Sequence, residues 1–89
     1  MQVRASHILV ASYDEANLLL NEIRNGAVFE DIARVKSKCP SGKNGGDLGY
    51  FNRGMMVKPF EDATLQLAKD EVSPPIQTQF GYHIIKRTG

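Results

Sequence analysis

The sequence contains no tryptophan, a single cysteine and almost no net charge. One cysteine cannot form an internal disulfide, so folding does not depend on an oxidising compartment. No apolar run approaches the roughly 20 residues of a membrane-spanning helix, and the first residues lack the layout of a signal peptide. A net charge of +1 gives no reason to expect a nucleic-acid partner. These absences predict a cytoplasmic protein without a transmembrane segment.

Length and composition indicate one domain. With 89 residues, of which 42% are hydrophobic, the chain can bury a single modest core but not a second one. No internal repeat or low-complexity stretch divides it. We therefore expect residues 1–89 to form a single domain and the protein to be a monomer.

The segment 37–51, SKCPSGKNGGDLGYF, joins the only cysteine to a loop that contains four glycines. Glycine lets the backbone adopt positive φ or approach another group closely, and these glycines do not suit a helix or a strand. The segment therefore predicts a shaped loop that presents Cys39 near its start. His7 and His83, from opposite ends of the chain, could meet Cys39 in one site.

The first third of the chain predicts a strand followed by two helices. Residues 3–10 are rich in apolar side chains and indicate a strand that carries His7 on the same face as Leu9. Ser12 and Glu15 have the spacing of a capping box, which predicts the start of a helix. An Asn-Gly pair at residues 25 and 26 predicts its end, and a second helix is expected over residues 28–37.

The second half of the chain adds one helix and three strands. Residues 48–51 predict a short strand, and Pro59 suits the first turn of a helix. Residues 76–79 and 82–87 predict two strands that form a tight hairpin through Phe80 and Gly81. This order of elements predicts an α+β domain with a mostly antiparallel sheet of about four strands.

Three chemistries could use Cys39 together with His7 and His83. In a cysteine hydrolase, a histidine would hold the thiolate. In an open zinc site, the three side chains would bind the metal. In a non-covalent site, they would form the polar floor of an apolar pocket. The alternative without function is that Cys39 is a small buried hydrophobic residue and both histidines belong to the core.

Four segments favour the non-covalent site. The order SHILV, SKCPSGKNGGDLGYF, MVKPFEDA and TQFGYHIIKR closely resembles the parvulin family of peptidyl-prolyl cis/trans isomerases, from Ala5 to Arg87. The resemblance implies the parvulin fold, a four-stranded, mostly antiparallel sheet flanked by about four helices. It implies rotation of X-Pro bonds in peptides and unfolded proteins, and thereby assistance to protein folding, with no cofactor and no metal.

The resemblance also implies roles for individual residues. It places a polar cluster beneath a pocket for the proline ring, and Cys39 occupies a position that the family fills with Cys or Asp, which disfavours an obligate thiolate nucleophile. Rotation about an X-Pro bond breaks no covalent bond, so a pocket that grips the ring and removes water suffices in principle. The implied polar residues are His7, Cys39, Thr78 and His83, and the implied pocket residues are Leu48, Met56, Phe60 and Phe80.

Charged residues bear on the choice of substrate. Family members that act on phosphoserine or phosphothreonine before proline carry basic residues after the first strand, whereas residues 11–15 here include Asp14 and Glu15 and no Lys or Arg. These carboxylates would repel a phosphate, so we expect a phosphate-independent enzyme. A basic rim of Lys36, Lys38 and Lys43 could contact acidic partners or a membrane surface.

The alternative function is a binding or chaperone module that holds unfolded chains with little turnover. A pure binder would not need the polar floor of His7, Cys39 and His83, so the presence of these residues favours activity.

Overall fold

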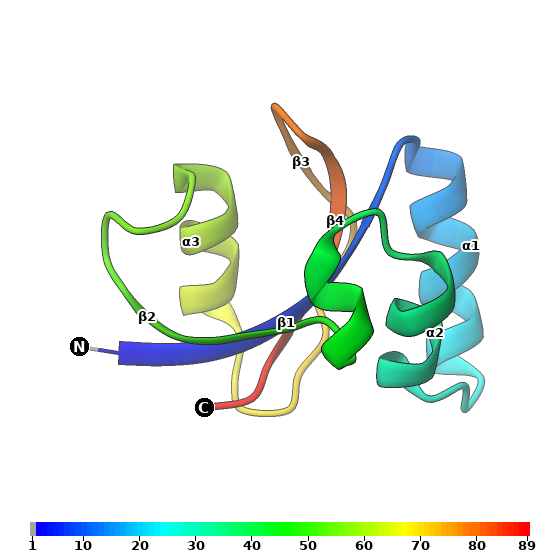
Figure 1. Ribbon diagram of the computed structural model, residues 1–89, viewed down its shortest axis with the longest axis horizontal. Coiled ribbons are helices and arrows are strands. Elements are labelled where there is room, and N and C mark those ends of the chain that lie inside the picture. The colour runs from blue at the N-terminus through cyan, green and yellow to red at the C-terminus, as the bar shows by residue number, and fades with distance from the viewer. Residues whose placement is uncertain (1) are drawn as a thin grey trace.

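The computed structural model describes residues 2–89 and shows a four-stranded antiparallel sheet in the order β2-β1-β4-β3 (Figure 1). The strands are β1 (Gln2–Val10), β2 (Asp47–Asn52), β3 (Ile76–Thr78) and β4 (Gly81–Arg87). The helices are α1 (Tyr13–Arg24), α2 (Phe29–Lys36), α3 (Lys58–Gln66) and the short 3-10 helix η1 (Pro40–Asn44). The expected α+β fold with an antiparallel sheet is confirmed.

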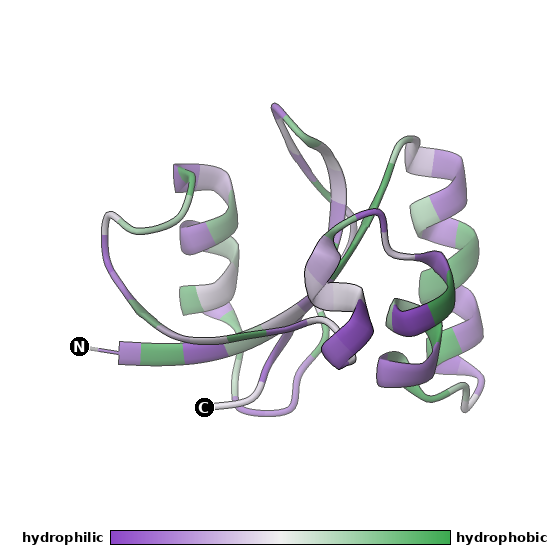
Figure 2. Ribbon diagram, in the orientation of Figure 1, coloured by the Kyte–Doolittle hydropathy of each residue, from purple (hydrophilic) through white to green (hydrophobic). Residues whose placement is uncertain are grey.

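The sheet lies between two layers of helices. On one face Ile8, Val10 and Ile84 pack against buried side chains of α1 and α2. On the other face Val3, Ala5 and Ile85 pack against Phe51 and against Phe60 of α3. The adjacent residues 84 and 85 therefore pack into the cores on opposite faces of the sheet, as the two-residue period of a strand requires. Figure 2 shows the resulting mixture of hydrophobic and hydrophilic residues along β1 and α1.

The predicted ends of α1 are confirmed. Ser12 is the N-cap, and its Oγ accepts a hydrogen bond from the backbone N–H of Glu15 at 3.2 Å. Gly26 follows the helix with a φ of +106°, a conformation that favours glycine. In α3, Pro59 lies in the first turn, where its missing N–H costs no helical hydrogen bond. None of the helices within residues 2–89 is long and apolar enough to cross a membrane.

The structure differs from the expectation in the glycine-rich segment and in the hairpin. Residues 40–44 form η1, because backbone bonds of the 3-10 type run from Gly42 N–H to Cys39 O and from Gly45 N–H to Gly42 O. In the hairpin, Thr78 pairs with Gly81, so the two-residue turn consists of residues 79 and 80 and begins one residue earlier than predicted.

Candidate active site

Three adjacent strands bring Thr78, His83 and His7 into one row. His83 of β4 is opposite Leu9 of β1 and opposite Ile76 of β3. His7 and Thr78 lie two residues from these partners, so both are diagonal neighbours of His83 on the same face of the sheet. The antiparallel register thus explains how residues 76 positions apart in the chain come into contact.

The row is held by short hydrogen bonds. The Nδ1 atoms of His7 and His83 are 2.9 Å apart, and His83 Nε2 is 2.7 Å from Thr78 Oγ1. Thr78 Oγ1 also accepts a bond from the backbone N–H of Phe80 at 3.1 Å. His7 Nε2 is buried and has no hydrogen-bond partner within residues 2–89. His83 therefore bonds both of its neighbours and fixes the row.

Both imidazoles are buried and neutral at pH 7. His7 is 5% exposed and His83 is 4% exposed. Burial, and secondly the neighbouring His83, lowers the pKa of His7 from 6.5 to about 4. Burial also lowers the pKa of His83. A low-dielectric site disfavours the charged imidazolium, so the pair provides polarity without net charge.

The glycine-rich segment fixes the position of His7. The backbone N–H of His7 donates to the carbonyl of Gly46 at 2.9 Å. Gly46 has a φ of +87°, and a Cβ there would lie 2.3 Å from the His7 carbonyl oxygen. Only glycine fits this approach, so the loop and β1 are locked together at the histidine.

Ser37 attaches the cysteine to the same strand. Its Oγ accepts bonds from the backbone N–H groups of Leu9, at 3.0 Å, and of Cys39, at 3.3 Å. The Lys38 N–H donates to the Leu9 carbonyl at 2.8 Å. Cys39 is half-buried, and its sulfur accepts a bond from the Ser41 hydroxyl at 3.2 Å. These bonds hold Cys39 beside the histidine pair.

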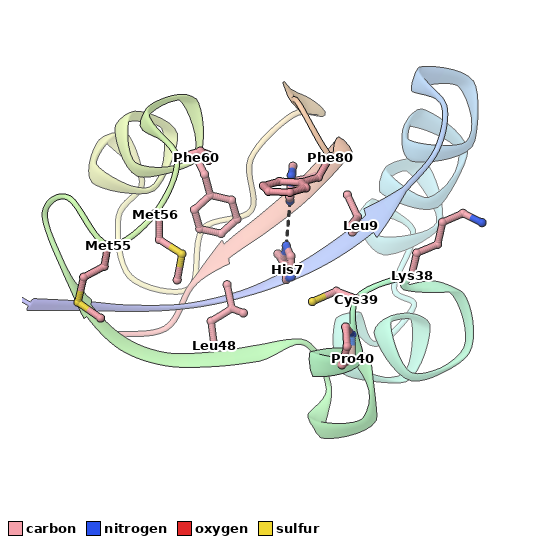
Figure 3. Close-up of a pocket in the computed structure, with 12 residues that line it drawn as sticks. His7, Leu9, Lys38, Cys39, Pro40, Leu48, Met55, Met56, Phe60 and Phe80 are labelled. Atoms are coloured by element: carbon pink, nitrogen blue, oxygen red, sulfur yellow. Dashed lines mark hydrogen bonds between the residues drawn. The ribbon is translucent and has the colours of Figure 1, made fainter.

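An apolar cavity of about 450 Å³ lies over these polar groups (Figure 3). The Phe60 ring is nearly perpendicular to both imidazoles, with centroids 5.5 Å from His7 and 5.3 Å from His83. The other apolar side chains come from β1, from η1, from β2 and the loop after it, and from the hairpin turn. They are Leu9, Pro40, Leu48, Met55, Met56, Val57 and Phe80.

A bulge in β2 accompanies the placement of Leu48. Between Arg4 and Ser6 of β1, the paired residues of β2 are Tyr50 and Asp47, so β2 contains one extra residue. Gly49 lies at this irregularity with a φ of +73°. Bulges redirect a strand and its side chains, and Leu48 lines the cavity.

The structure therefore brings seven of the eight expected residues to the cavity. Thr78 is the exception, because it does not line the cavity and is connected to it by its hydrogen bonds with His83 and with the backbone N–H of Phe80. Of the basic rim, only Lys38 lines the cavity, whereas Lys36 lies in a separate groove between α1 and α2. Asp14 and Glu15 lie in the first turn of α1 and do not line the cavity.

Several contributing residues were absent from the expected set. Leu9 could have been added, because it follows His7 by two residues on the same strand face. The roles of Ser37, Ser41 and Gly46 depend on how the loop folds back onto β1, and no sequence pattern indicates those contacts.

The geometry disfavours a thiolate-histidine pair and a zinc site. The two Nδ1 atoms face each other, His83 Nε2 faces Thr78, and His7 Nε2 has no partner, so no imidazole nitrogen bonds the Cys39 sulfur within residues 2–89. A nucleophilic thiol needs such a base. The arrangement instead resembles the floor of a binding pocket.

Comparison with known proteins decides the family. Residues 6–89 match the rotamase family described as the PPIC-type PPIase domain. A peptidyl-prolyl cis-trans isomerase Pin1 of Malus domestica is 42% identical over an alignment of 114 positions, which covers 99% of this chain and 94% of that protein. The chain belongs to the PPIC-type peptidyl-prolyl isomerase family. Its sequence and fold are those of a parvulin-type domain.

Solved structures of two similar proteins share the fold. The parvulin NmPin of Nitrosopumilus maritimus has a TM-score of 0.88 and 48% identity, with 99% of this chain and 96% of that chain covered. PrsA from Bacillus anthracis has a TM-score of 0.98 and 44% identity, with 99% of this chain and 41% of that chain covered.

The parvulin domain also resembles part of longer proteins. Foldase protein PrsA 1 of Bacillus cereus is 51% identical over 88 residues, which are 98% of this chain. The chain spans 31% of the length of that relative.

Proposed function

We propose that this parvulin domain catalyses rotation about X-Pro bonds in the cavity over His7 and His83, without a covalent intermediate and without a need for phosphate. The observation that carries the proposal is an apolar cavity whose floor is a neutral, hydrogen-bonded imidazole pair. The cavity suits a proline ring, and the neutral floor provides polarity beside the peptide bond that must rotate.

The apolar wall explains how the barrier would fall. Rotation about the bond costs ~18–20 kcal/mol because amide resonance is lost in the twisted state. Water stabilises the charge-separated resonance form, so a dry cavity that holds the ring disfavours the planar ground state relative to the twisted state. We assign this binding to Leu48, Met56, Phe60 and Phe80.

The polar floor is assigned one proton arrangement. The Phe80 N–H donates to Thr78 Oγ1, and the Thr78 hydroxyl then donates to His83 Nε2. Neutral His83 therefore carries its proton on Nδ1 and donates it to His7 Nδ1, which leaves the His7 proton on Nε2. This arrangement uses every hydrogen bond of the row once. In this proposal Thr78 is a positioning residue, because it acts through His83.

Cys39 is assigned the tuning of polarity at the edge of the floor. Its sulfur accepts a bond from Ser41 and lacks a histidine base, which supports a non-covalent role. Figure 3 shows the sulfur directed toward the middle of the site, beside His7 and Leu48. An Asp at this position could accept similar hydrogen bonds.

Phosphate independence is supported by the lack of a basic cluster. A phosphate dianion is bound by several charge-assisted hydrogen bonds, most often from arginine. No arginine lines the cavity among residues 2–89, and Asp14 and Glu15 lie in the first turn of α1, the helix that follows β1. Paired Ser-Pro and phosphoserine-Pro peptides test this point at fixed ionic strength. We expect any advantage of the phosphoserine-Pro peptide in kcat/KM to stay well below tenfold. An advantage of tenfold or more would contradict phosphate independence.

The wider role is assistance to protein folding, with X-Pro segments of unfolded chains as partners. The foldase names of the PrsA relatives support this role. We also propose a monomer, which light scattering would test, and a cytoplasmic location, which cell fractionation would test.

A protease-coupled assay on a short X-Pro peptide tests the proposal. Uncatalysed exchange takes tens to hundreds of seconds, so catalysis appears as an added fast phase that is proportional to the protein concentration. We expect such a phase. Saturable peptide binding without acceleration would instead indicate the binding module.

A further inference from the structure

Lys38 is a charged residue at an otherwise uncharged cavity. It is the only lysine, arginine, aspartate or glutamate among the described residues that line the cavity. The four ion pairs within residues 2–89 join other side chains, so no carboxylate neutralises Lys38.

The backbone of Lys38 is fixed, whereas its side chain is exposed. The Lys38 N–H donates to the Leu9 carbonyl at 2.8 Å, and Ser37 bonds both Leu9 and Cys39. The ammonium extends outward past the edge of the cavity (Figure 3). Because the backbone is fixed and the aliphatic side chain is flexible, the ammonium can meet a substrate group at the edge without rearrangement of the site.

The order of groups along the cavity indicates which part of a substrate meets Lys38. Figure 3 shows Met56 and Phe60 at one end, His7 and Cys39 in the middle, and Lys38 at the other end. With the proline ring against Met56 and Phe60, the rotating bond lies over His7 and Cys39. The residue before proline is attached to that bond, so it continues toward Lys38.

We propose that Lys38 is a specificity-determining residue that favours an acidic side chain immediately before proline. The proposal rests on the proposed function of the cavity. The chemistry is that of an exposed ion pair between one ammonium and one carboxylate.

A single exposed ammonium implies a modest preference. Exposed ion pairs contribute ~0.2–1 kcal/mol, which corresponds to at most about a fivefold difference. The preference should weaken with salt, because both charges face solvent. One lysine supplies a point charge rather than the several convergent donors of a phosphate receptor, so a carboxylate selector and phosphate independence are compatible.

The test compares peptides that are identical except for Glu-Pro or Gln-Pro. The ratio of their kcat/KM values is measured for the wild type, Lys38→Gln and Lys38→Glu. Because each ratio is taken within one protein, an overall change in turnover cancels. Lys36→Gln and Lys43→Gln are matched controls, since both remove an exposed lysine of the same rim that does not line the cavity.

We expect a ratio of about 1.4 to 5 in the wild type and in both controls at low salt. The ratio should approach one in Lys38→Gln and fall below one in Lys38→Glu. An unchanged ratio in Lys38→Gln would overturn the proposal. Equal losses in the two controls would also overturn it, because they would indicate a general field rather than a contact.

A binding measurement keeps the test separate from the proposed function. Dissociation constants of the two peptides from NMR titrations give the same ratio without turnover. If no peptide is turned over but the binding ratio depends on Lys38, the proposed catalysis fails and the specificity stands. Turnover of both peptides with a ratio of one in the wild type overturns the specificity alone.

Discussion

The contact between Gly46 and His7 can be tested with two glycine substitutions that share the same backbone strain. Gly46 and Gly54 both have a φ of +87°. A Cβ on Gly46 would lie 2.3 Å from the His7 carbonyl oxygen, whereas a Cβ on Gly54 would meet nothing within 4 Å. Gly46→Ala and Gly54→Ala therefore share a positive φ, and they differ in that Gly46 is buried and its added methyl group would clash, whereas Gly54 is exposed and its added methyl group would not.

Both variants should lose ~1–2 kcal/mol from the left-handed conformation of an alanine. Gly46→Ala should lose a further ~1–3 kcal/mol, because the backbone must separate and the buried bond from His7 N–H to Gly46 O is broken. Urea denaturation followed by circular dichroism measures the stability, and the coupled assay measures kcat/KM at a temperature where both variants are folded. Gly46→Ala should also lose more turnover, since His7 moves. Equal stability and equal turnover in the two variants would refute this account of the loop.

The other predictions concern the pocket, the cysteine and the histidine pair. Met56→Ala should lower kcat/KM about five- to thirtyfold, because it removes contacts worth ~1–2 kcal/mol, whereas Leu18→Ala on the exposed face of α1 should not; equal values for both would contradict the pocket assignment. Phe60→Ala should lower the free energy of unfolding by ~3–5 kcal/mol in a denaturant titration, because this residue is 2% exposed and belongs to the core. A loss below 1 kcal/mol would contradict the placement of Phe60 in the core. Cys39→Asp should retain turnover, as should the native protein in excess chelator, and complete loss in either case would indicate a nucleophile or a metal. The pKa of His7 is about 4 in the folded state and near 6.5 when unfolded. The free energy of unfolding should therefore be highest above pH 6.5 and should fall by roughly 3 kcal/mol as the pH approaches 4. A titration midpoint of His7 near pH 6.5, measured by NMR on the folded protein, would contradict this prediction.

The Phe60 prediction illustrates what a sequence pattern does not distinguish. The sequence predicted Phe60 as pocket wall, and the structure places the same ring against both histidines and against Phe51, with a centroid distance of 6.2 Å to the latter. One face of the residue can serve the core while another lines the cavity. An apolar residue in an amphipathic helix carries no mark of such a double role.

Local features of the fold were predictable because each depends on few neighbouring residues. The N-cap at Ser12, the helix end at Gly26 and the strand that carries His7 follow from short-range rules. The pairing of His7 with His83 came from the family resemblance, because spacing alone left three chemistries open.

The route of the glycine-rich segment could not be predicted. Its glycines indicated a loop, but the 3-10 helix and the contact of Gly46 with His7 depend on tertiary packing. Ser37 bonds Leu9, which is 28 positions away in the chain, and no local rule anticipates such a contact. The position of Lys38 at the cavity follows from the same fold of the loop.

Exchange NMR on an X-Pro peptide, with no protease present, tests the central claim most directly. The free peptide gives separate cis and trans signals, and its two isomers interconvert over tens to hundreds of seconds, which is too slow to give exchange cross-peaks between those signals. A catalytic amount of the protein should produce exchange between the cis and trans signals, and the mass of the peptide should stay unchanged. The peptide should also shift the protein signals of Leu48, Met56 and Phe60. Binding at these residues without exchange, or exchange with the shifts elsewhere on the protein, would contradict isomerisation in this cavity.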